Sequence, residues 1–186
     1  DYNINTGESS TYILRIENLE TGKIVTAQTP VVSKIYVTNP APPAIVDFTT
    51  NPYIVEWYSA YFGRVYDVTV RFHYGEADIS NPFNYVQKSV DWHLGQKIST
   101  NLYSSFKMQI NIGKNDFFIY LQSQIPVDPN KTRLAGKVDF IFTAGADDFY
   151  TYYRVNGFPS GLSQNIPTFT NIEGGLGIFS SRYIQN

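Results

Sequence analysis

The stretch VYDVTVRFHY at residues 65–74 decides the fold. Apolar or aromatic side chains alternate with polar ones along it, which is typical of a β-strand with one buried face. A slip of one residue would bury Asp67 and Arg71, so the alternation also fixes the register of this strand. The buried face is expected to hold Tyr66, Val68, Val70, Phe72 and Tyr74.

Strand patterns continue on both sides of this stretch. A polar loop with Pro82 is expected at residues 75–85, and Gly174-Gly175-Leu176-Gly177 is expected to form a turn or a bulge. A Trp-containing strand followed by a long alternating one is typical of immunoglobulin- and fibronectin-like sandwiches. The expected strands lie at residues 12–16, 24–29, 35–37, 54–58, 86–93, 106–112, 138–142 and 178–184.

Two short helices interrupt the β pattern. Asn115 or Asp116 can cap a helix that Pro126 ends, and Asp147 can cap a second one that stops at Asn156. The sequence therefore predicts a mainly β chain with immunoglobulin- or fibronectin-like β-sandwich elements and two short helices in the C-terminal half. The side chains expected to point inward are Phe118, Leu121 and Ile125 on the first helix and Phe149, Tyr152 and Tyr153 on the second.

A proline-rich segment at residues 39–43 divides the chain. Proline lacks the N–H donor that a sheet ladder needs, so this segment is expected to be an edge or a linker. It predicts two units: residues 1–39, a hairpin segment that ends a preceding β domain, and residues 40–186, a β-rich domain with two short helices. The chain starts at Asp1 without a Met, which is typical of a trimmed piece of a longer precursor,.

Composition excludes several classes of protein. The net charge is −2 and only 16% of the 186 residues are charged, with no cluster of Lys or Arg. Nucleic-acid binding needs a basic stripe that neutralises phosphates, so this class is set aside. The chain has no cysteine, which excludes disulfides, thiol catalysis and cysteine metal sites,.

Candidate catalytic and metal-binding residues are few. Asp91 and His93 lie two apart on an expected strand, so their side chains share a face and could offer two metal ligands. A third ligand would have to be Glu76 or Asp78, and a solvated strand face is the favoured interpretation. Asp147 and Asp148 could serve as paired carboxylates in acid–base work, but adjacent helical residues diverge and helix capping is the favoured interpretation. We therefore expect no catalytic residue, no metal and no cofactor.

Aromatic side chains are the best candidates for binding. Tyr and Phe contribute 15 and 13 residues, and such rings can stack on sugars or anchor a protein interface,. The alternative, that at least half of them belong to the core, is favoured about two to one because β cores readily accept aromatic residues. The candidate binding residues are Trp57, Tyr58, Tyr61, Phe62, Tyr150, Tyr152 and Tyr153.

Both ends of the chain resemble one protein family. The motifs are DFYTYY at residues 148–153, PTFTNIEGGLGIF at residues 167–179, and the hairpin pattern of residues 12–30. They resemble the C-terminal part of a family of uncharacterised Bacteroidetes lipoproteins that close with Asn-Ile-x-Gly-Gly-Leu-Gly-x-Phe. The resemblance is looser through residues 40–135. It implies an outer-membrane lipoprotein, anchored at the cell surface through an upstream cysteine and often encoded beside TonB-dependent transporters.

The resemblance implies no particular activity, because the biochemistry of that family is unassigned. The expected function is a non-catalytic cell-surface binding or scaffolding subunit, accessory to a TonB-dependent nutrient transporter. The alternative is a carbohydrate- or protein-binding adhesion module independent of transport. The expected partners are therefore the transporter and a glycan or peptide ligand, with a membrane tether only through the upstream lipid anchor.

Overall fold

The computed structural model describes residues 10–41, 44–49, 52–103, 105–156 and 169–186. Among the described residues 49% lie in strands and 11% in helices, arranged as three antiparallel sheets and two helices, so the mainly β prediction is confirmed. The resemblance to immunoglobulin or fibronectin sandwiches in particular stays a prediction. The strands are β1 (Thr11–Glu17), β2 (Ile24–Pro30), β3 (Tyr36–Asn39), β4 (Tyr53–Tyr58), β5 (Val65–Asp78), β6 (Val86–Ile98), β7 (Lys107–Ile112), β8 (Lys131–Gly145), β9 (Ile172–Glu173) and β10 (Arg182–Gln185).

The longest strands form a four-stranded sheet in the order β10-β8-β5-β6. The stretch at residues 65–74 lies at its centre, as part of β5, and pairs with β6 on one side and β8 on the other. Tyr66, Val68 and Val70 are at most 1% exposed, while Asp67 and Arg71 face the other side of the sheet and are half-buried. The alternation therefore predicted which face of β5 is buried from Tyr66 to Val70. The pairing itself shifts register between Val68 and Thr69 against β6 and between Phe72 and Tyr74 against β8.

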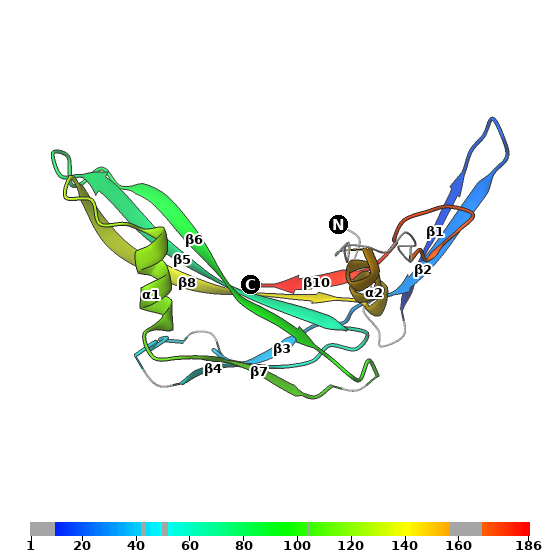
Figure 1. Cartoon of the computed structure of the whole chain (residues 1–186), viewed down its shortest axis with the longest axis horizontal. Coiled ribbons are helices and arrows are strands. Elements are labelled where there is room, and N and C mark those ends of the chain that lie inside the picture. The colour runs from blue at the N-terminus through cyan, green and yellow to red at the C-terminus, as the bar shows by residue number, and fades with distance from the viewer. Residues whose placement is uncertain (1–9, 42–43, 50–51, 104, 157–168) are drawn as a thin grey trace, which may run out of the picture.

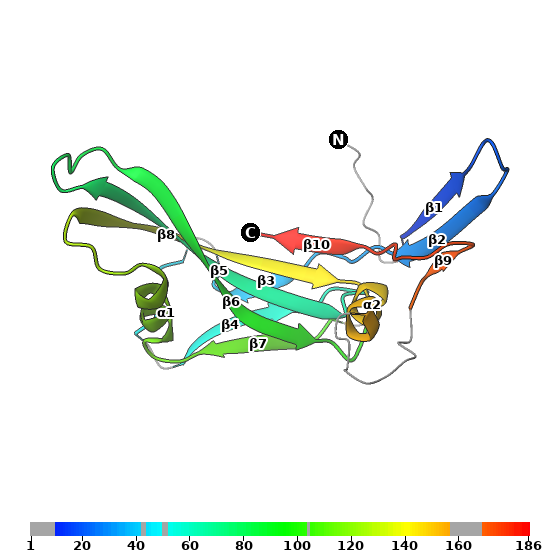
Figure 2. The ribbon, with the colours of Figure 1, turned by 45° about the horizontal axis from the view of Figure 1, so that its top comes forward.

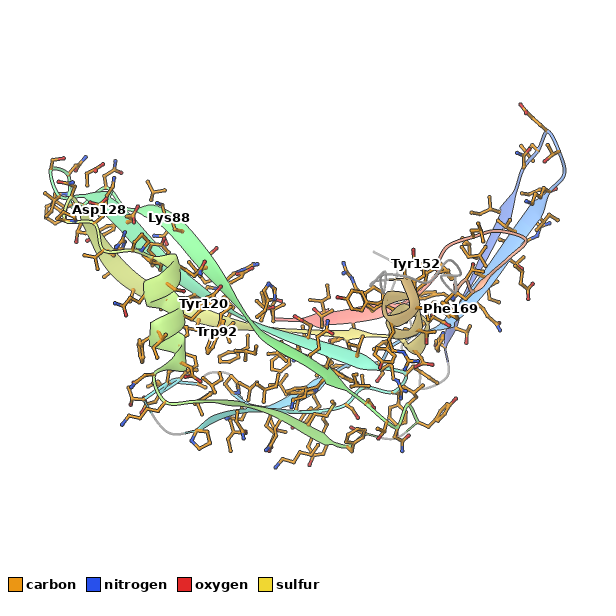
Figure 3. The ribbon with its side chains drawn as sticks, viewed as in Figure 1. Lys88, Trp92, Tyr120, Asp128, Tyr152 and Phe169 are labelled. Atoms are coloured by element: carbon orange, nitrogen blue, oxygen red, sulfur yellow. The ribbon has the colours of Figure 1, made fainter. Side chains whose placement is uncertain are left out.

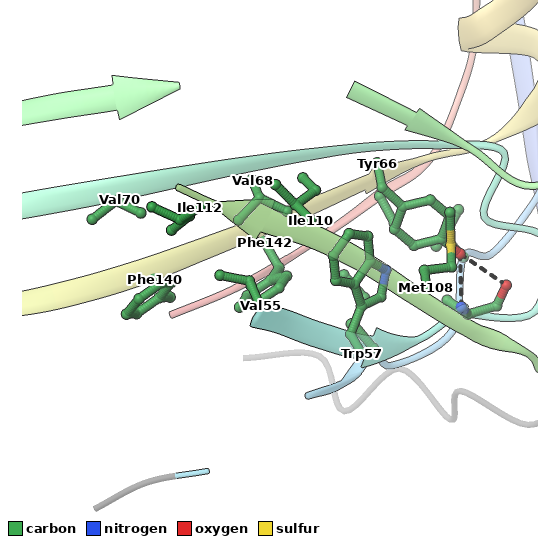
Figure 4. Close-up of a cluster of buried hydrophobic side chains, with 14 of the residues drawn as sticks. Val55, Trp57, Tyr66, Val68, Val70, Met108, Ile110, Ile112, Phe140 and Phe142 are labelled. Carbon is green, nitrogen blue, oxygen red and sulfur yellow. Dashed lines mark hydrogen bonds between the residues drawn. The ribbon is translucent and has the colours of Figure 1, made fainter. Parts of the chain in front are cut away.

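A second sheet, in the order β3-β4-β7, packs against the inner face of the first. The two layers enclose the hydrophobic core as a β-sandwich, with Val55 and Trp57 from β4 and Ile110 from β7 opposite Val68 from β5 (Figure 4). Trp57 lies 5.6 Å from Phe142 between ring centroids. Burial of these side chains is the main stabilising term of the fold.

Three strands run further than their sequence patterns indicate. β5 extends through Asp78, where a loop was expected, and β8 occupies 15 residues instead of the five at 138–142. Together with β6 they form an extension of the main sheet that reaches beyond the second layer (Figure 1). The alternation fades in this extension because neither face is covered by a full second sheet.

Helix α1 (Asp116–Gln124) covers the side of this extension. Phe117 is its buried residue and Phe118 is 47% exposed, so the expected stripe is wrong at that position. The Tyr120 hydroxyl donates to the backbone oxygen of Asp91 at 2.6 Å, and its ring stacks on Trp92. These contacts fix α1 to β6.

Helix α2 (Asp147–Asn156) lies at the other end of the main sheet. Its extent agrees with the sequence, but Phe149 and Tyr153 are 45% and 48% exposed, so their expected inward placement is wrong. The helix instead presents several aromatic side chains at its surface. No helix within the described residues is both long and apolar enough to cross a membrane.

A third sheet projects from the sandwich as an arm, in the order β1-β2-β9 (Figure 1). β9 comes from the C-terminal part of the chain and pairs with Thr26 and Ala27. The turn after β9 contains Gly174 and Gly177 at φ 75° and 129°, which confirms the expected glycine turn,. The boundary after Asn39 stays a prediction, although β3 before it pairs with β4 after it.

Candidate functional site

The aromatic candidates from the sequence do not form one surface. Trp57 is 0% exposed and belongs to the core, so the prediction that it contacts a ligand is corrected. Its neighbours in β4 explain why: Glu56 and Tyr58 face outward, so the alternation turns Trp57 inward,. The other candidates lie at three separate places on the molecule.

The first two places are on and beside the smaller sheet. Tyr58 pairs across the strands with Tyr36 on its outer face, with ring centroids 6.3 Å apart and planes tilted by 46°. Phe62 lies in the following turn and contacts the exposed ring of Tyr103 edge-on, at 5.8 Å and 87°. Tyr61 beside it is half-buried. Neither pair offers the coplanar rings on which a sugar stacks.

The third place is α2. The Tyr150 ring lies under two guanidinium groups, with Arg64 at 5.4 Å and Arg154 at 5.8 Å from the ring centroid. Tyr152 is half-buried and projects from the helix (Figure 3), while Tyr153 is the most exposed of the three. Tyr150 thus has a cation–π role that holds α2 against the sheet.

Asp91 and His93 do share a strand face, as the sequence predicts, but each has a separate partner. Asp91 accepts two hydrogen bonds from Arg71, at 2.6 and 2.7 Å. His93 Nδ1 lies 2.9 Å from the Thr69 hydroxyl and 3.8 Å from Asp67 Oδ1. The Arg71 hydrogen bonds outweigh the opposing effect of burial and lower the pKa of Asp91.

A second histidine pair lies on the same outer face. His73 Nε2 contacts Asp139 Oδ2 at 2.7 Å, and Lys137 lies 3.0 Å from the other carboxylate oxygen. Burial raises the pKa of Asp139, but the hydrogen bonds from Lys137 and His73 together lower it below its ordinary value. On this face Arg71 is therefore paired with Asp91 and Lys137 with Asp139, and His73 adds a hydrogen-bond contact to Asp139.

The proposed third metal ligands are also committed elsewhere. Glu76 lies between Lys88 and Arg133, and Asp78 pairs with Lys131. No group of three or more His, Asp or Glu side chains that could hold a metal occurs within the described residues. On this geometry the outer face is a structural network of cross-strand ion pairs.

A concave site lies instead at the base of the arm. An open hollow of about 650 Å³ separates the β1-β2-β9 sheet from α2. We call it the arm hollow. Its lining comes from elements far apart in the sequence. The lining residues are Thr11 and Ile13 of β1, Thr26, Ala27, Gln28, Thr29 and Pro30 of β2, Asp148 of α2, and Asn171 and Glu173 in and beside β9.

Two side chains of the arm hollow are fixed by neighbours. The Thr26 hydroxyl donates to Glu173 Oε2 at 3.0 Å. The Asn171 amide donates to the Phe179 backbone oxygen at 2.7 Å and accepts from the Phe179 N–H at 2.8 Å. The amide nitrogen of Asn171 carries two N–H groups, so it can also donate a hydrogen bond to the Asp148 carboxylate,.

Asp148 differs from its neighbours in its electrostatics. Burial raises its pKa above the ordinary value, the adjacent Asp147 charge adds to this, and the hydrogen bond with Asn171 opposes both. With Glu173 it gives the arm hollow two carboxylates and several amide and hydroxyl groups. Such a lining suits a ligand that presents hydroxyl or amino donors.

The sequence contained part of the signal for this site. Thr26 and Gln28 alternate with Val25 and Ala27 on β2, which marks a polar strand face,. The placement of Glu173 beside Thr26 joins residues 147 positions apart, and no local pattern indicates it. Comparison with protein-family models, with curated proteins and with solved structures finds no match to this chain.

Proposed function

We propose that this chain is a non-catalytic binding or scaffolding subunit at the cell surface, lipid-anchored in the outer membrane and accessory to a TonB-dependent nutrient transporter. The observation that carries the binding role is the arm hollow, which combines two carboxylates, two amides and three threonines in one concave surface. The membrane and transporter parts of the proposal rest on the family resemblance of residues 148–153 and 167–179.

The ion-paired outer face of the main sheet supports a scaffolding role. Arg71 with Asp91 and His73 with Asp139 tie neighbouring strands together, so these groups stabilise a rigid platform. A rigid sheet that carries a concave site at its end is an arrangement that holds a ligand in a fixed position. The ligand class that fits the lining is a donor-rich one, a glycan or a basic peptide.

The transporter role is tested by isolation of the full-length protein from the organism that makes it. Extraction in mild detergent and mass spectrometry of the co-purified proteins is expected to give a TonB-dependent transporter in stoichiometric amount. A protein that purifies alone would contradict the accessory role. It would favour the alternative, an adhesion module that binds carbohydrate or protein independently of transport.

The ligand role is tested on this chain directly. We expect a glycan array or a library of basic peptides to identify ligands whose affinity falls in Asp148→Asn and Glu173→Gln. Glu20→Gln is the matched control, because Glu20 is an exposed carboxylate in the hairpin turn and does not line the arm hollow. Equal binding by all three variants would contradict the placement of the ligand in the arm hollow.

A further inference from the structure

The outer edge of β1 presents backbone groups to the surroundings. In the part of the chain that the structure describes, β1 ends its sheet and pairs only with β2. Asn18 N–H donates to Lys23 O, and Val31 N–H donates to Ser10 O, so the even-numbered residues of the strand bond to β2. In an antiparallel ladder the bonded positions alternate. The N–H and C=O groups of Thr11, Ile13, Arg15 and Glu17 therefore point outward.

This edge lacks the usual protection against strand pairing. It has seven residues and contains no proline, no lysine and no register shift,. Arg15 is its only cation and lies 3.0 Å from Glu17, so the two charges offset each other. Ile13 and Ile16 are 76% and 54% exposed, one on each face of the hairpin. The arm projects away from the sandwich, which leaves the edge accessible (Figures 1 and 2).

The sequence of β1 is complementary to itself when two copies run antiparallel. With a two-fold axis at Leu14, Thr11 faces Glu17 of the second copy and Ile13 faces Arg15 of the second copy. The four residues whose N–H and C=O groups point outward then lie opposite the same four residues of the second copy. Their backbone groups can form about eight hydrogen bonds across the seven-residue overlap. On the opposite face, Tyr12 contacts Ile16 of the second copy and the two Leu14 side chains contact each other.

Other registers fit less well. Moving the axis to Arg15 places two arginines directly opposite, which is unfavourable. Moving it to Ile13 shortens the overlap to residues 11–15 and leaves Glu17 of each strand without an opposite residue in the other β1. The axis at Leu14 is thus the register that uses the whole strand, avoids like charges opposite one another and aligns the apolar side chains.

We propose that two copies of this chain associate through antiparallel pairing of β1 with β1, which joins the two arms into one continuous sheet. This inference goes beyond the proposed function and does not depend on a ligand in the arm hollow or on a transporter.

Single cysteines placed in β1 report the register directly, because residues 1–186 contain no other cysteine. Opposed residues in a non-hydrogen-bonded pair have Cα atoms about 4.5 Å apart, within the range of a disulfide. Leu14→Cys is therefore expected to cross-link two chains under mild oxidation. Ile13→Cys and Arg15→Cys are the matched controls, and either of them cross-linking in preference to Leu14→Cys would overturn the proposed register.

Analytical ultracentrifugation of the unmodified chain tests the association itself. We expect a concentration-dependent shift from one chain mass to two. Ile13→Pro removes an outward N–H from each copy without touching the β1–β2 ladder, so it should weaken association by roughly tenfold to a hundredfold. Ile13→Ala keeps that N–H and should weaken association less.

Two results would overturn the proposal. One is an unmodified chain that stays monomeric at the highest concentration it tolerates. In that case slow hydrogen exchange of the Ile13 and Arg15 N–H groups would not rescue the proposal, because it would mean that something other than a second copy covers the edge. The other is an association constant that Ile13→Pro leaves unchanged while circular dichroism shows the variant to be folded.

Discussion

The buried hydroxyl of Tyr66 gives the sharpest test of the core. Tyr66 is 1% exposed, and its oxygen accepts a hydrogen bond from the Ala60 N–H at 2.7 Å (Figure 4). The same oxygen lies 3.3 Å from the backbone oxygens of Ala60 and Gly63, to one of which it donates. Tyr66→Phe removes this group and leaves the rest of the ring in place.

The expected cost at neutral pH follows from the Ala60 N–H. Ala60 is 1% exposed, so its donor loses a partner without gaining water. An unsatisfied buried donor costs about 1–3 kcal/mol. We therefore expect Tyr66→Phe to lower the free energy of unfolding by about that amount at pH 7.

Alkaline pH adds a second, independent expectation. Burial raises the pKa of Tyr66 from 10.0 to about 12 in the folded chain, and the hydrogen bonds with Ala60 and Ser59 oppose the shift. Between these two values the unfolded chain has lost the tyrosine proton and the folded chain keeps it. The contribution of Tyr66 to the free energy of unfolding is thus complete below pH 10 and decreases as the pH rises. At pH 11 it is smaller by about 1.4 kcal/mol.

Urea unfolding of both proteins at pH 7 and pH 11 measures the two effects together. The difference between wild type and Tyr66→Phe should shrink by about 1.4 kcal/mol at the higher pH, since phenylalanine cannot titrate. Other tyrosines titrate in both proteins and cancel in the comparison. Tyr36→Phe is the control, because Tyr36 is 66% exposed and should change stability by less than about 0.5 kcal/mol at either pH,. A difference that is the same at both pH values would refute the reasoning.

Three further predictions concern packing and charge. Trp57→Ala, at a fully buried position, should lower the free energy of unfolding by about 3–5 kcal/mol in a urea titration, and a loss below 1 kcal/mol would contradict its core role,. Gly63→Ala would place a Cβ against the Tyr66 hydroxyl and 2.9 Å from its Cζ, so we expect a loss of about 1–3 kcal/mol that a double-mutant cycle with Tyr66→Phe finds to be non-additive,. Asp91→Asn breaks a partly exposed pair with Arg71, and thermal melts should give a loss of at most about 1 kcal/mol at pH 7,. Because the pKa of Asp91 is lowered in the folded chain, this loss should begin to shrink as the pH falls below 3.8 and should disappear once the pH is below the lowered pKa of the folded chain. A loss that does not shrink at all in acid would not be electrostatic,.

Strand positions in the sandwich were predictable from the sequence because each strand has one buried face. In β7, Met108, Ile110 and Ile112 are buried and alternate with exposed residues, so the period of two is clear,. The glycine turn after β9 was predictable for a similarly local reason, since positive φ favours glycine,. Both features depend only on residues close together in the chain.

The aromatic candidates show where local reasoning stops. Glu56 already indicated that Trp57 faces the core, and that signal was available in the sequence. The contact of Tyr150 with Arg64 was not, because it depends on where α2 meets the sheet. A shift of one residue, about 100° around the helix, likewise separates Phe117, which is buried, from Phe118, which is exposed,. Helical phase in a nine-residue helix is too weakly marked to decide between them,.

In the extension of the main sheet, polar sequences form strands because charged side chains pair across them. Beyond the sandwich, cross-strand pairs replace a second layer: Glu76 of β5 contacts Lys88 of β6 and Arg133 of β8, so one carboxylate joins three strands. Asp78 and Lys131 repeat the arrangement at the end of the sheet. Hydrophobic periodicity cannot detect such a strand, since the side chains that hold it are charged. The Glu76 side chain is only 11% exposed between its two cations, whereas Asp78 is 62% exposed and its pair with Lys131 contributes little,. The backbone ladder from β5 to its two neighbours adds to these pairs along the whole extension.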